Sequence, residues 1–375
     1  MRIAHFIIGR CNPDSANGVD KTVYYLSKTQ AALDHEVAVF SLSIKPPLPI
    51  PKVQVKAYPP KRNPFALPKK FLWDLKDWRP QIVHMHSVYI PQNWALHQWL
   101  HKEKIPFVVT PHGGLNQQVT KQRFYLKLPY KYLMELQLLN RAAFVHSVGD
   151  TDAILRYGVK APVAVVPNGL DLDSLPSDPD PHYLTKKMPE LKGKRIFLFI
   201  GRLDPDHKGL DLLLAAFAQI DTQNCVLVLV GPYWKNSNVE LHRIVNELQI
   251  ERNVIFLGPV FGKEKFDILA SCDVFVHPSR WEGLPFSVLE ACALAKPCLV
   301  TEAANPAGLM TKYSAGIVVK DKEDSIHSGL VNLLNMGEYQ LVKMGKNART
   351  MVEREFQWLA AAEKLIKEYR KYAQQ

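Results

Sequence analysis

The sequence lacks the features that would place it in a membrane or in an oxidising compartment. No apolar run approaches the ~18–20 residues that span a bilayer. A short apolar run follows Met1, but a polar loop without a small-residue cleavage site comes next, so we interpret it as a first strand and not as a signal peptide. The cysteines are few, odd in number and without a Cys-x-x-Cys pair. They predict reduced core thiols in a cytoplasmic protein and neither disulfides nor a zinc site.

Two further shortages narrow the class of protein. Neither half contains Gly-x-Gly-x-x-Gly, which disfavours an NAD-dependent Rossmann enzyme. Acidic residues are scarce in residues 1–170, where 22 Lys+Arg face 10 Asp+Glu, whereas residues 171–375 hold 25 against 26. The net charge of +11 therefore belongs to one half, and it predicts an acidic partner or surface for that half.

Short β-branched apolar runs alternate with helical segments, and this pattern starts twice in the 375 residues. Such strands indicate parallel sheets covered by helices on both faces. We expect two Rossmann-like, doubly wound α/β domains that face a central cleft. The expected strands are Arg2–Ile8, His35–Leu42, Val53–Tyr58, Gln81–His86, Phe107–Thr110, Ala143–Ser147, Val163–Val166, Arg195–Ile200, Val226–Val230, Val254–Leu257, Val274–His277, Cys298–Thr301 and Ala315–Val319.

The boundary between the domains is expected in a stretch rich in Pro and Asp. We place the first domain at residues 1–170, a linker at 171–190 and the second domain at 191–355. The basic, Ala-rich helix within 356–375 either caps the second domain or returns to the first, and we expect it to return.

Glu282 and Glu290 are the most informative residues. The run before them ends at Pro278, Gly283 permits a tight turn, and Pro285 suits the first position of a helix. Glu282 is therefore expected in a strand-to-helix loop and Glu290 about a turn and a half into the helix. Together with the amides of a helix start, two carboxylates suit a ligand with many hydroxyls and a phosphate, such as a sugar nucleotide. The alternative is a solvated helix start.

Arg202 and Lys208 form a second motif. Arg202 follows a buried strand that ends at Gly201, and Lys208 precedes Gly209 at the opening of the next helix. Two cations at the carboxyl end of a parallel strand suit a diphosphate. The nearby Asp204-x-Asp206 triplet resembles a metal-binding pattern, but these cations already supply positive charge, so we expect no metal.

The histidines and the first loop are open to more than one interpretation. His112 follows a strand and precedes two glycines, where it either faces a ligand or caps a turn. His84 and His86 share one face of a strand, but no third metal ligand is evident, so packing or active-site lining is favoured. Asn17 and Gly18 precede a helix, where backbone amides can face a phosphate or an acceptor.

Residues 121–140 form an expected helix that Pro129 breaks or kinks. Cations and aromatic residues interleave along it. This mixture suits an anionic membrane surface or a lipid-phosphate acceptor. Single-stranded nucleic acid and an ordinary surface helix are the alternatives.

In sequence order, these residues resemble the retaining glycosyltransferases of family 4, which have the GT-B fold. The resemblance covers nearly the whole chain, although the first loop has Asn17-Gly18 where the family often has Gly-Gly. Asn tolerates a left-handed backbone well enough for that loop to form. The matching motifs are Asn17-Gly18, Thr110-Pro-His-Gly113, Val166-Pro-Asn-Gly-Leu-Asp171, Gly201-Arg-Leu with Lys208-Gly209, Gly231-Pro232, Gly258 and Glu282–Glu290.

The resemblance implies roles for these residues. Arg202 and Lys208 would bind the donor diphosphate, Glu282 the donor sugar, and Glu290 the nucleotide ribose. His112 would contact the sugar near the reacting carbon, and with Arg202, Lys208 and Glu282 it makes up the catalytic set. The donor-binding set is Asn17, Gly18, Gly201, Arg202, Lys208, Gly231, Gly258, Glu282, Gly283, Leu284, Pro285, Phe286, Ser287 and Glu290.

The function implied is a retaining, nucleotide-diphosphate-sugar-dependent hexosyltransferase that acts without a metal cofactor by front-face attack. Its setting would be the assembly of polysaccharide, lipid-linked oligosaccharide or glycolipid, with a UDP-linked or GDP-linked donor. The protein would be cytoplasmic, with peripheral association on anionic membrane through the basic half and no nucleic-acid partner. A transferase with a small-molecule or protein acceptor and a non-catalytic sugar-nucleotide-binding protein are the alternatives.

Overall fold

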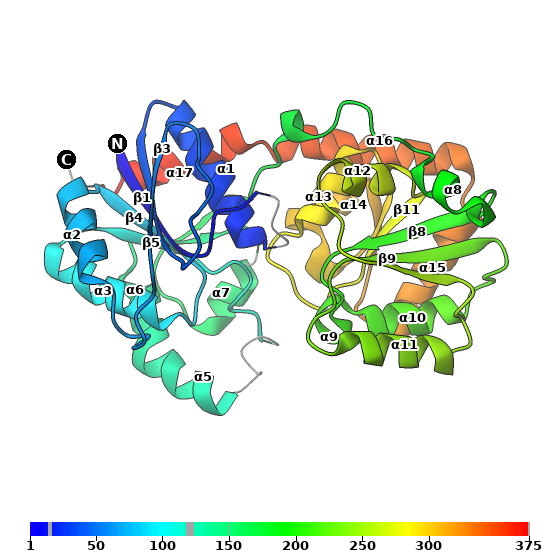
Figure 1. Cartoon of the computed structure of the whole chain (residues 1–375), viewed down its shortest axis with the longest axis horizontal. Coiled ribbons are helices and arrows are strands. Elements are labelled where there is room, and N and C mark those ends of the chain that lie inside the picture. Colours follow the sequence, from blue (N-terminus) through cyan, green and yellow to red (C-terminus); the bar gives the residue numbers. More distant parts are fainter. Residues whose placement is uncertain (14–16, 118–123, 150, 374–375) are drawn as a thin grey trace. The chain divides into compact units, whose positions relative to one another are not determined.

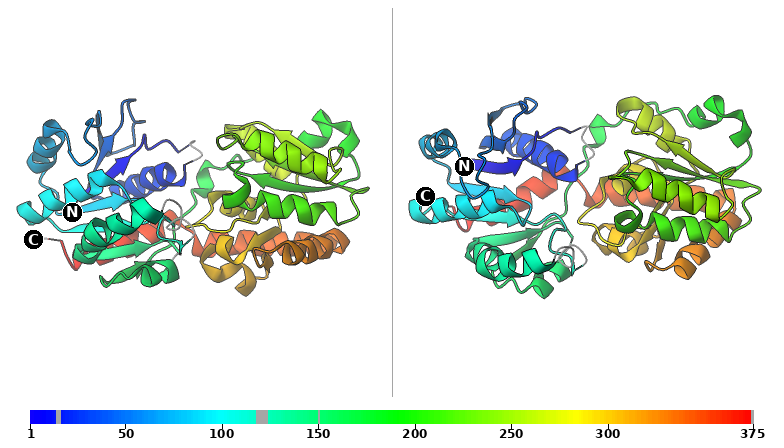
Figure 2. Two further views of the ribbon diagram at one scale, coloured as in Figure 1. Left: turned by 90° about the horizontal axis from the view of Figure 1, so that it is seen from below. Right: turned by 60° about the horizontal axis from the view of Figure 1, so that its bottom comes forward.

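The computed structural model describes residues 1–13, 17–117, 124–149 and 151–373. The chain divides into two compact units, which we treat separately (Figure 1, Figure 2). The first unit comprises Met1–Gly169 and Trp358–Gln375, and the second comprises Leu170–Gln357. Lys and Arg outnumber Asp and Glu by 26 to 12 in the first unit, whereas the second holds 21 against 24. The basic excess predicted for the amino-terminal half therefore belongs to the first unit.

The first unit is built on a seven-stranded parallel sheet with the order β3-β2-β1-β4-β5-β6-β7. Its strands are β1 (Arg2–Ile8), β2 (Glu36–Leu42), β3 (Val53–Tyr58), β4 (Ile82–His86), β5 (Phe107–Thr110), β6 (Phe144–Ser147) and β7 (Val163–Val165). Its helices are α1 (Gly18–Ala32), α2 (Lys69–Trp78), α3 (Pro91–Glu103), α5 (Phe124–Tyr130), α6 (Leu136–Arg141), α7 (Thr151–Tyr157) and α17 (Trp358–Arg370).

The two faces of this sheet carry different side chains, because successive residues of a strand point to opposite sides. Ala4 and Phe6 of β1 belong to a large apolar core that includes residues of α2, α3 and α6. Ile7 belongs to a smaller apolar cluster with Val23 of α1. His5, which lies between Ala4 and Phe6, therefore points to the side of α1.

The C-terminal helix α17 belongs to the first unit and packs on α1. The Trp358 ring stacks on Tyr25 at a centroid distance of 6.0 Å, and Tyr369 is fully buried beside Phe144. Gly169 and Trp358 lie where the chain leaves and re-enters the first unit, and a Cβ on Gly169 would overlap the backbone of Trp358. Close packing at both ends thus fixes α17 to the sheet of this unit.

The second unit has a six-stranded parallel sheet with the order β10-β9-β8-β11-β12-β13. Its strands are β8 (Arg195–Ile200), β9 (Cys225–Val230), β10 (Val254–Leu257), β11 (Val274–His277), β12 (Cys298–Thr301) and β13 (Gly316–Val319). Its helices are α8 (Tyr183–Lys187), α9 (Pro205–Lys208), α10 (Leu210–Ala218), α11 (Ser237–Glu247), α12 (Gly262–Ala270), α13 (Phe286–Ala293), α14 (Leu309–Lys312), α15 (Glu323–Asn335) and α16 (Glu338–Glu355).

The α/β class and the strands predicted from the sequence are confirmed. All thirteen expected strands are present among the described residues, each within one residue of its predicted bounds. The cysteines are also free thiols and buried, as expected. Continuous apolar runs identify such strands because both faces of a parallel sheet are covered.

The segment predicted as a linker, 171–190, differs from that prediction. It belongs to the second unit, where Leu184 of α8 is buried and the backbone N–H of Asp180 donates to Asp267 of α12. Its Pro and Asp residues gave a linker-like composition, but one apolar side chain and polar contacts suffice to hold it against α12.

The helix expected over 121–140 has an irregular centre. It is described from Phe124, so Lys121 and Arg123 lie outside the described residues. After Pro129 the chain continues as a π-helical turn, Lys131–Glu135, before α6. Proline removes one backbone donor and crowds the preceding turn, so regular α-helical bonding is interrupted at this point. In the described part of the chain, no helix is long and apolar enough to cross a bilayer.

Candidate active site

The candidate site in the second unit lies where its strand order reverses. β8 pairs with β9 on one side and with β11 on the other, so the carboxyl ends of β8 and β11 flank the reversal. Ligands of open α/β sheets bind at this position. Arg202 and Lys208 follow β8, and Glu282 follows β11. The three charged residues singled out in the sequence therefore surround one topological switch point.

Lys208, Glu282 and His277 form the centre of the site. The Lys208 ammonium donates a short, charge-assisted hydrogen bond to Glu282 Oε1. His277, at the end of β11, places Nε2 3.0 Å from the same oxygen. The side chains of Lys208 and Glu282 are 13% and 11% exposed. A cation and an anion are thus held together, nearly buried, at the carboxyl edge of the sheet.

The charge states follow from this geometry. Burial alone would raise the pKa of Glu282, but Lys208 and the hydrogen bond from His277 hold it well below its ordinary value. Burial lowers the pKa of His277, against the opposing effect of Glu282. At neutral pH Glu282 is ionised and His277 is neutral. His277 therefore donates through Nε2–H, and its Nδ1 is buried without a partner among the described residues.

Arg202 is positioned by a histidine that the sequence interpretation passed over. The Arg202 guanidinium donates to His207 Nδ1 at 3.1 Å and lies 4.2 Å from the ring centroid of Trp234. Burial lowers the pKa of His207 to about 4, so the neutral ring can accept from Arg202 and donate Nε2–H to the Trp281 carbonyl at 3.0 Å. His207 also stacks on Trp281 at 4.5 Å. It thereby joins the two loops that carry Arg202 and Glu282.

Close backbone approaches explain two glycines of the site. Gly209 has φ 63°, and a Cβ there would overlap the carbonyl oxygen of Pro278, just after β11. A Cβ on Gly231, which has φ 144°, would overlap the carbonyl oxygen of Gly201. Backbone with a positive φ also favours glycine, because glycine has no Cβ that could clash. Gly209 also corrects the prediction for Lys208, which ends the short helix α9 and does not open α10.

Glu290 lies in α13, as predicted, and Glu282 lies in the preceding loop. Glu290 is buried and pairs with Lys265 of α12 at 2.8 Å, so the alternative of a solvated surface residue is wrong. Pro285 is the N-cap of α13 and Phe286 its first residue, one position later than predicted. The nearly buried side chains of Leu284 and Phe286 flank Pro285, and Ser287 is half-buried.

The other predicted donor residues are more dispersed. Gly201 follows β8, and Gly258 follows β10, where its Cα faces open space. Gly283 lies in the loop after Glu282. In the first unit, Asn17 accepts from the N–H of Val19 as the N-cap of α1.

Asn17 has an extended backbone, so the loop forms without using the tolerance of Asn for a left-handed conformation. Its short side chain instead satisfies a helix N–H, which is the usual role of Asn at this position. Gly18 is the first residue of α1.

His112 lies in the first unit and has φ 52°. Its imidazole Nε2 is 3.0 Å from His86 Nδ1, and the two rings stack at 5.3 Å. Burial lowers the pKa of His112 to about 3. Through its contact with His86, the His112 ring lies against the sheet face that carries His84 and His86.

A third imidazole, that of His5 on the neighbouring strand β1, lies beside His84 and His86. The sequence did not reveal it. Ring nitrogens of His5, His84 and His86 lie within 4.8 Å of one another. Each of their six nitrogens already has a hydrogen-bonding partner in the structure. No carboxylate belongs to this group of potential ligands. We interpret the group as a hydrogen-bonded network and not as a metal centre.

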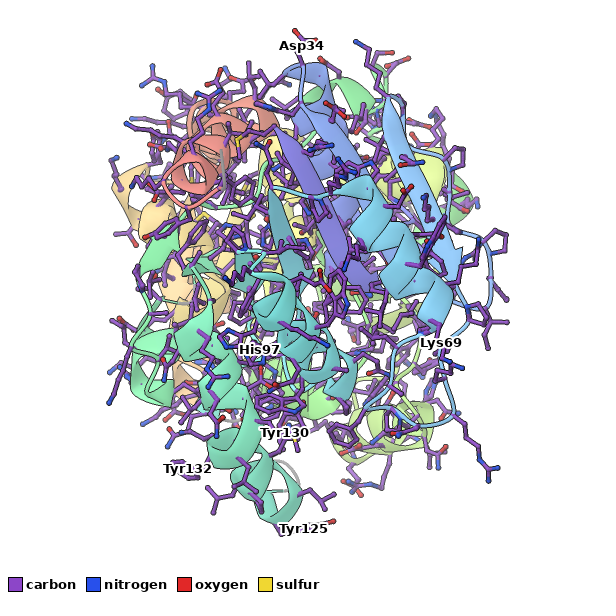
Figure 3. The ribbon with its side chains drawn as sticks, turned by 90° about the vertical axis from the view of Figure 1, so that its left-hand side faces the viewer. Asp34, Lys69, His97, Tyr125, Tyr130 and Tyr132 are labelled. Carbon is purple, nitrogen blue, oxygen red and sulfur yellow. The ribbon has the colours of Figure 1, made fainter. Side chains whose placement is uncertain are left out.

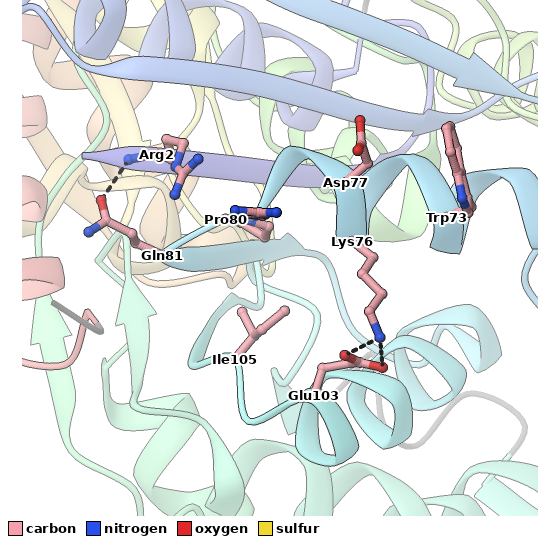
Figure 4. Close-up of a pocket in the computed structure, with 9 residues that line it drawn as sticks. Arg2, Trp73, Lys76, Asp77, Pro80, Gln81, Glu103 and Ile105 are labelled. Atoms are coloured by element: carbon pink, nitrogen blue, oxygen red, sulfur yellow. Dashed lines mark hydrogen bonds and ion pairs between the residues drawn. The ribbon is translucent and has the colours of Figure 1, made fainter.

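A pocket in the first unit lies at the amino-terminal ends of the strands of its sheet, opposite to their carboxyl ends (Figure 4). Arg2 begins β1 and Gln81 precedes β4, and these two residues are hydrogen-bonded at 3.0 Å. Ligands of parallel sheets bind at the carboxyl ends of the strands, so we do not assign this pocket to the reaction. It is lined by Arg2, Trp73, Lys76, Asp77, Arg79, Pro80, Gln81, Glu103 and Ile105.

Comparison with known proteins gives the family. The model for "Glycosyl transferases group 1" matches residues 184–351, and that for "Glycosyltransferase Family 4" matches residues 16–174. The UDP-Gal:alpha-D-GlcNAc-diphosphoundecaprenol alpha-1,3-galactosyltransferase of Escherichia coli is 26% identical over 78% of this chain and 75% of the relative. The putative teichuronic acid biosynthesis glycosyltransferase TuaC of Bacillus subtilis is 24% identical over 66% of this chain and 59% of the relative.

Solved structures show the same fold. Sucrose-phosphate synthase from Thermosynechococcus elongatus superposes with a TM-score of 0.79 at 21% identity, over 99% of this chain and 98% of that one. Anabaena HepE in complex with UDP-glucose gives 0.78 at 18% identity, over 99% and 100%. Fold and site thus define a glycosyltransferase with the GT-B fold. The chain belongs to glycosyltransferase family 4.

Proposed function

We propose that this glycosyltransferase moves a sugar from a nucleotide diphosphate to an acceptor hydroxyl with retention of configuration. The observation that carries the proposal is the placement of Arg202, Lys208 and Glu282 around the switch point of the second sheet. Two cations there suit a diphosphate, and a carboxylate suits sugar hydroxyls. The UDP-glucose complex of HepE and the UDP-galactose donor in the name of the E. coli relative support a UDP-linked donor.

The proposed mechanism depends on positioning and charge. Glu282 is already bound by Lys208 and His277, so it suits hydroxyl recognition better than nucleophilic attack. The acceptor oxygen would form its bond to the anomeric carbon on the face from which the diphosphate departs, and its proton would pass to that diphosphate. Arg202 and Lys208 would stabilise the negative charge on the leaving group. Ionised Glu282 would stabilise positive charge that develops on the sugar.

The remaining roles are proposals from the family resemblance. Glu290 would bind the ribose, and the loops of Gly231 and Gly258 would hold the base. The pair between Glu290 and Lys265 supports a fixed, ionised ribose-binding carboxylate. In the first unit, His112 would contact the donor sugar, and the unit as a whole would bind the acceptor. We propose that the reaction needs no metal, because Arg202 and Lys208 supply the positive charge at the diphosphate.

The experiment that tests this function measures nucleotide release and sugar transfer in Lys208→Ala and Arg202→Ala. Each should lose at least about a hundredfold in kcat, as removal of a charge-stabilising group does in other enzymes. Arg243→Ala is the matched control, because its side chain forms an exposed i,i+4 ion pair in the same unit. If both site variants keep the wild-type rate, the assignment is wrong.

We also propose that the acceptor is lipid-linked and that the first unit binds an anionic membrane surface, on the cytoplasmic side. Tyr125, Leu126 and Leu128 of α5 are exposed, as are Tyr132 and Leu133 in the π turn. Figure 3 shows Tyr125 at the outer end of α5 and Tyr132 on its outer side. This unit carries the basic excess, so apolar insertion and electrostatic attraction act together. The diphosphoundecaprenol acceptor in the name of the E. coli relative supports this setting.

Vesicle co-sedimentation tests the membrane proposal. The protein should sediment with vesicles of anionic lipid at low salt and be released at high salt. The double variant Leu126→Glu/Leu133→Glu should lose this binding, whereas Val239→Glu, an exposed apolar site on α11, should keep it. If the wild-type protein ignores anionic vesicles at low salt, a soluble acceptor becomes the better proposal.

A further inference from the structure

His112 ends a chain of buried hydrogen bonds that crosses the first sheet. His5 and His84 lie side by side on β1 and β4, and His86 lies beside Thr110 of β5. These residues share the sheet face covered by α1 and α17. Gln30 of α1 and Tyr369 of α17 contact them from above that face. The polar groups therefore meet in one layer between the sheet and these two helices.

The direction of each hydrogen bond can be worked out from two fixed ends, the Val166 carbonyl and the Gln30 side-chain carbonyl. A backbone carbonyl only accepts, so His146 must donate Nε2–H to the Val166 oxygen, at 2.7 Å. Burial lowers the pKa of His146 to about 4, so its ring is neutral and its Nδ1 accepts. The Thr110 hydroxyl, 2.7 Å from that nitrogen, must donate to it. The Thr110 oxygen then accepts Nε2–H from His84 at 2.5 Å.

The same logic continues through α17. His84 is also neutral, because burial holds its pKa well below the ordinary value, so its Nδ1 accepts the Tyr369 hydroxyl proton at 2.6 Å. This branch of the network ends at Tyr369, because the Gln30 amide nitrogen is buried without a hydrogen-bonding partner among the described residues.

A second branch begins at Gln30, whose carbonyl oxygen lies 2.7 Å from His5 Nε2 and only accepts, so His5 donates Nε2–H. His5 Nδ1 accepts from His86 Nε2–H at 3.0 Å, because His5 is neutral with a pKa lowered by burial to about 4. His86 Nδ1 accepts in turn from His112 Nε2–H at 3.0 Å. Every proton from Gln30 to His112 is thereby assigned.

We propose that the chain from Gln30 to His112 locks His112 as the Nε2–H tautomer, so that its Nδ1 is presented as a hydrogen-bond acceptor. Gln30, His5 and His86 are positioning residues in this scheme. The chain begins at an amide oxygen, which has no basic site for an extra proton, so it orients the ring and does not relay protons. An acceptor nitrogen suits a sugar hydroxyl, and this last step rests on the proposed function of His112.

The test uses Gln30→Met, which removes the amide oxygen and keeps the length of the side chain. Tyr369→Phe is the matched control, because its hydroxyl bonds to His84 in the same layer but is outside the chain from Gln30 to His112. Long-range ¹H–¹⁵N NMR of ¹⁵N-histidine-labelled full-length protein reads the tautomer, with His112→Asn to assign the signal. Wild type and Tyr369→Phe should show one Nε2–H tautomer at His112, and Gln30→Met should show a mixture.

A second variant guards against a merely structural effect. His86→Phe cuts the chain next to His112, whereas His86→Gln keeps one acceptor and one donor and should restore much of the effect. Loss of one orienting hydrogen bond should lower kcat about three- to tenfold in Gln30→Met and His86→Phe, with thermal unfolding used to confirm folded protein.

A His112 that is Nδ1–H or mixed in the wild type overturns the proposal. So does wild-type activity in both chain-cutting variants, or stoichiometric metal at His5, His84 and His86 by elemental analysis. The NMR readout needs no substrate. Unaltered transfer in Arg202→Ala and Lys208→Ala would therefore refute the proposed function, whereas the NMR result would still decide whether the His112 tautomer is locked.

Discussion

Lys208→Met is the perturbation that most directly tests the electrostatics of the site. It keeps an extended side chain but removes the ammonium that neutralises Glu282. The carboxylate then keeps His277 as its remaining hydrogen-bonding partner among the described residues. Burial is the largest single influence on the pKa of Glu282, and without Lys208 only His277 and His207 oppose it. We expect the pKa of Glu282 to rise above its ordinary value in this variant.

The magnitude follows from the burial of the pair. Removing one partner of a buried ion pair costs about 3–5 kcal/mol. Since both side chains remain 11–13% exposed, we expect about 3 kcal/mol for Lys208→Met. In a unit of 188 residues this lowers Tm by about 6–12 °C. The double variant Lys208→Met/Glu282→Gln removes both charges and should recover most of that loss.

The pH dependence has opposite signs in the two proteins. In the wild type the pKa of Glu282 is depressed, so its stabilisation is present above the ordinary carboxyl pKa and is lost as pH falls through the lower, folded-state value. In Lys208→Met the pKa is raised, so stability is lost as pH rises through it. The gap in Tm between the two proteins should therefore widen from pH 5 to pH 8.

Thermal unfolding of the four proteins of this cycle is the assay. The exposed pair between Arg243 and Glu247 provides a control cycle that should show no measurable coupling. A Lys208→Met protein as stable as the wild type at pH 8, with a gap that does not change with pH, would refute the reasoning. Such a result would mean that water solvates Glu282 far better than its burial indicates.

Two other predictions concern backbone packing and thiol chemistry. Gly209→Ala should lower both Tm and donor affinity, because the new Cβ overlaps the Pro278 carbonyl. Gly193 also has a positive φ, but open space surrounds it, so Gly193→Ala should cost only the backbone strain, about 1–3 kcal/mol. The buried thiols should react with a thiol reagent only on unfolding, because burial raises the pKa of Cys11 to about 12 and that of Cys225 to about 11; rapid reaction of either thiol in the native protein would contradict their burial.

The sequence was sufficient for the strands and for the charged residues at their ends. A strand covered on both faces needs a continuous apolar run, so its bounds can be predicted from the local sequence. Glu282 and Arg202 follow such runs directly, which is why a switch-point site could be predicted from them. Local composition misled only where few contacts decide the outcome, as in 171–190, where Leu184 alone is deeply buried within α8.

The partners of these residues were beyond prediction because they are distant in sequence. Lys265 meets Glu290 from another helix, and His5 meets His86 from another strand, 81 residues away. His207 and His277 lay inside motifs that drew attention to their charged neighbours. His207 could have been found from its charged neighbours Asp206 and Lys208, and His277 from its place at the end of a predicted strand.

The two units use burial to opposite electrostatic ends. In the second unit a carboxylate is kept charged against the effect of burial, because Lys208 compensates it. In the first unit burial keeps His5, His84, His86, His112 and His146 neutral, with no carboxylate bonded to any of them among the described residues. A neutral imidazole has one donor and one acceptor, so a chain of such rings has a direction that charged rings would lose. Charge therefore suits the second unit for a diphosphate, and neutrality suits the first for presenting a single oriented lone pair.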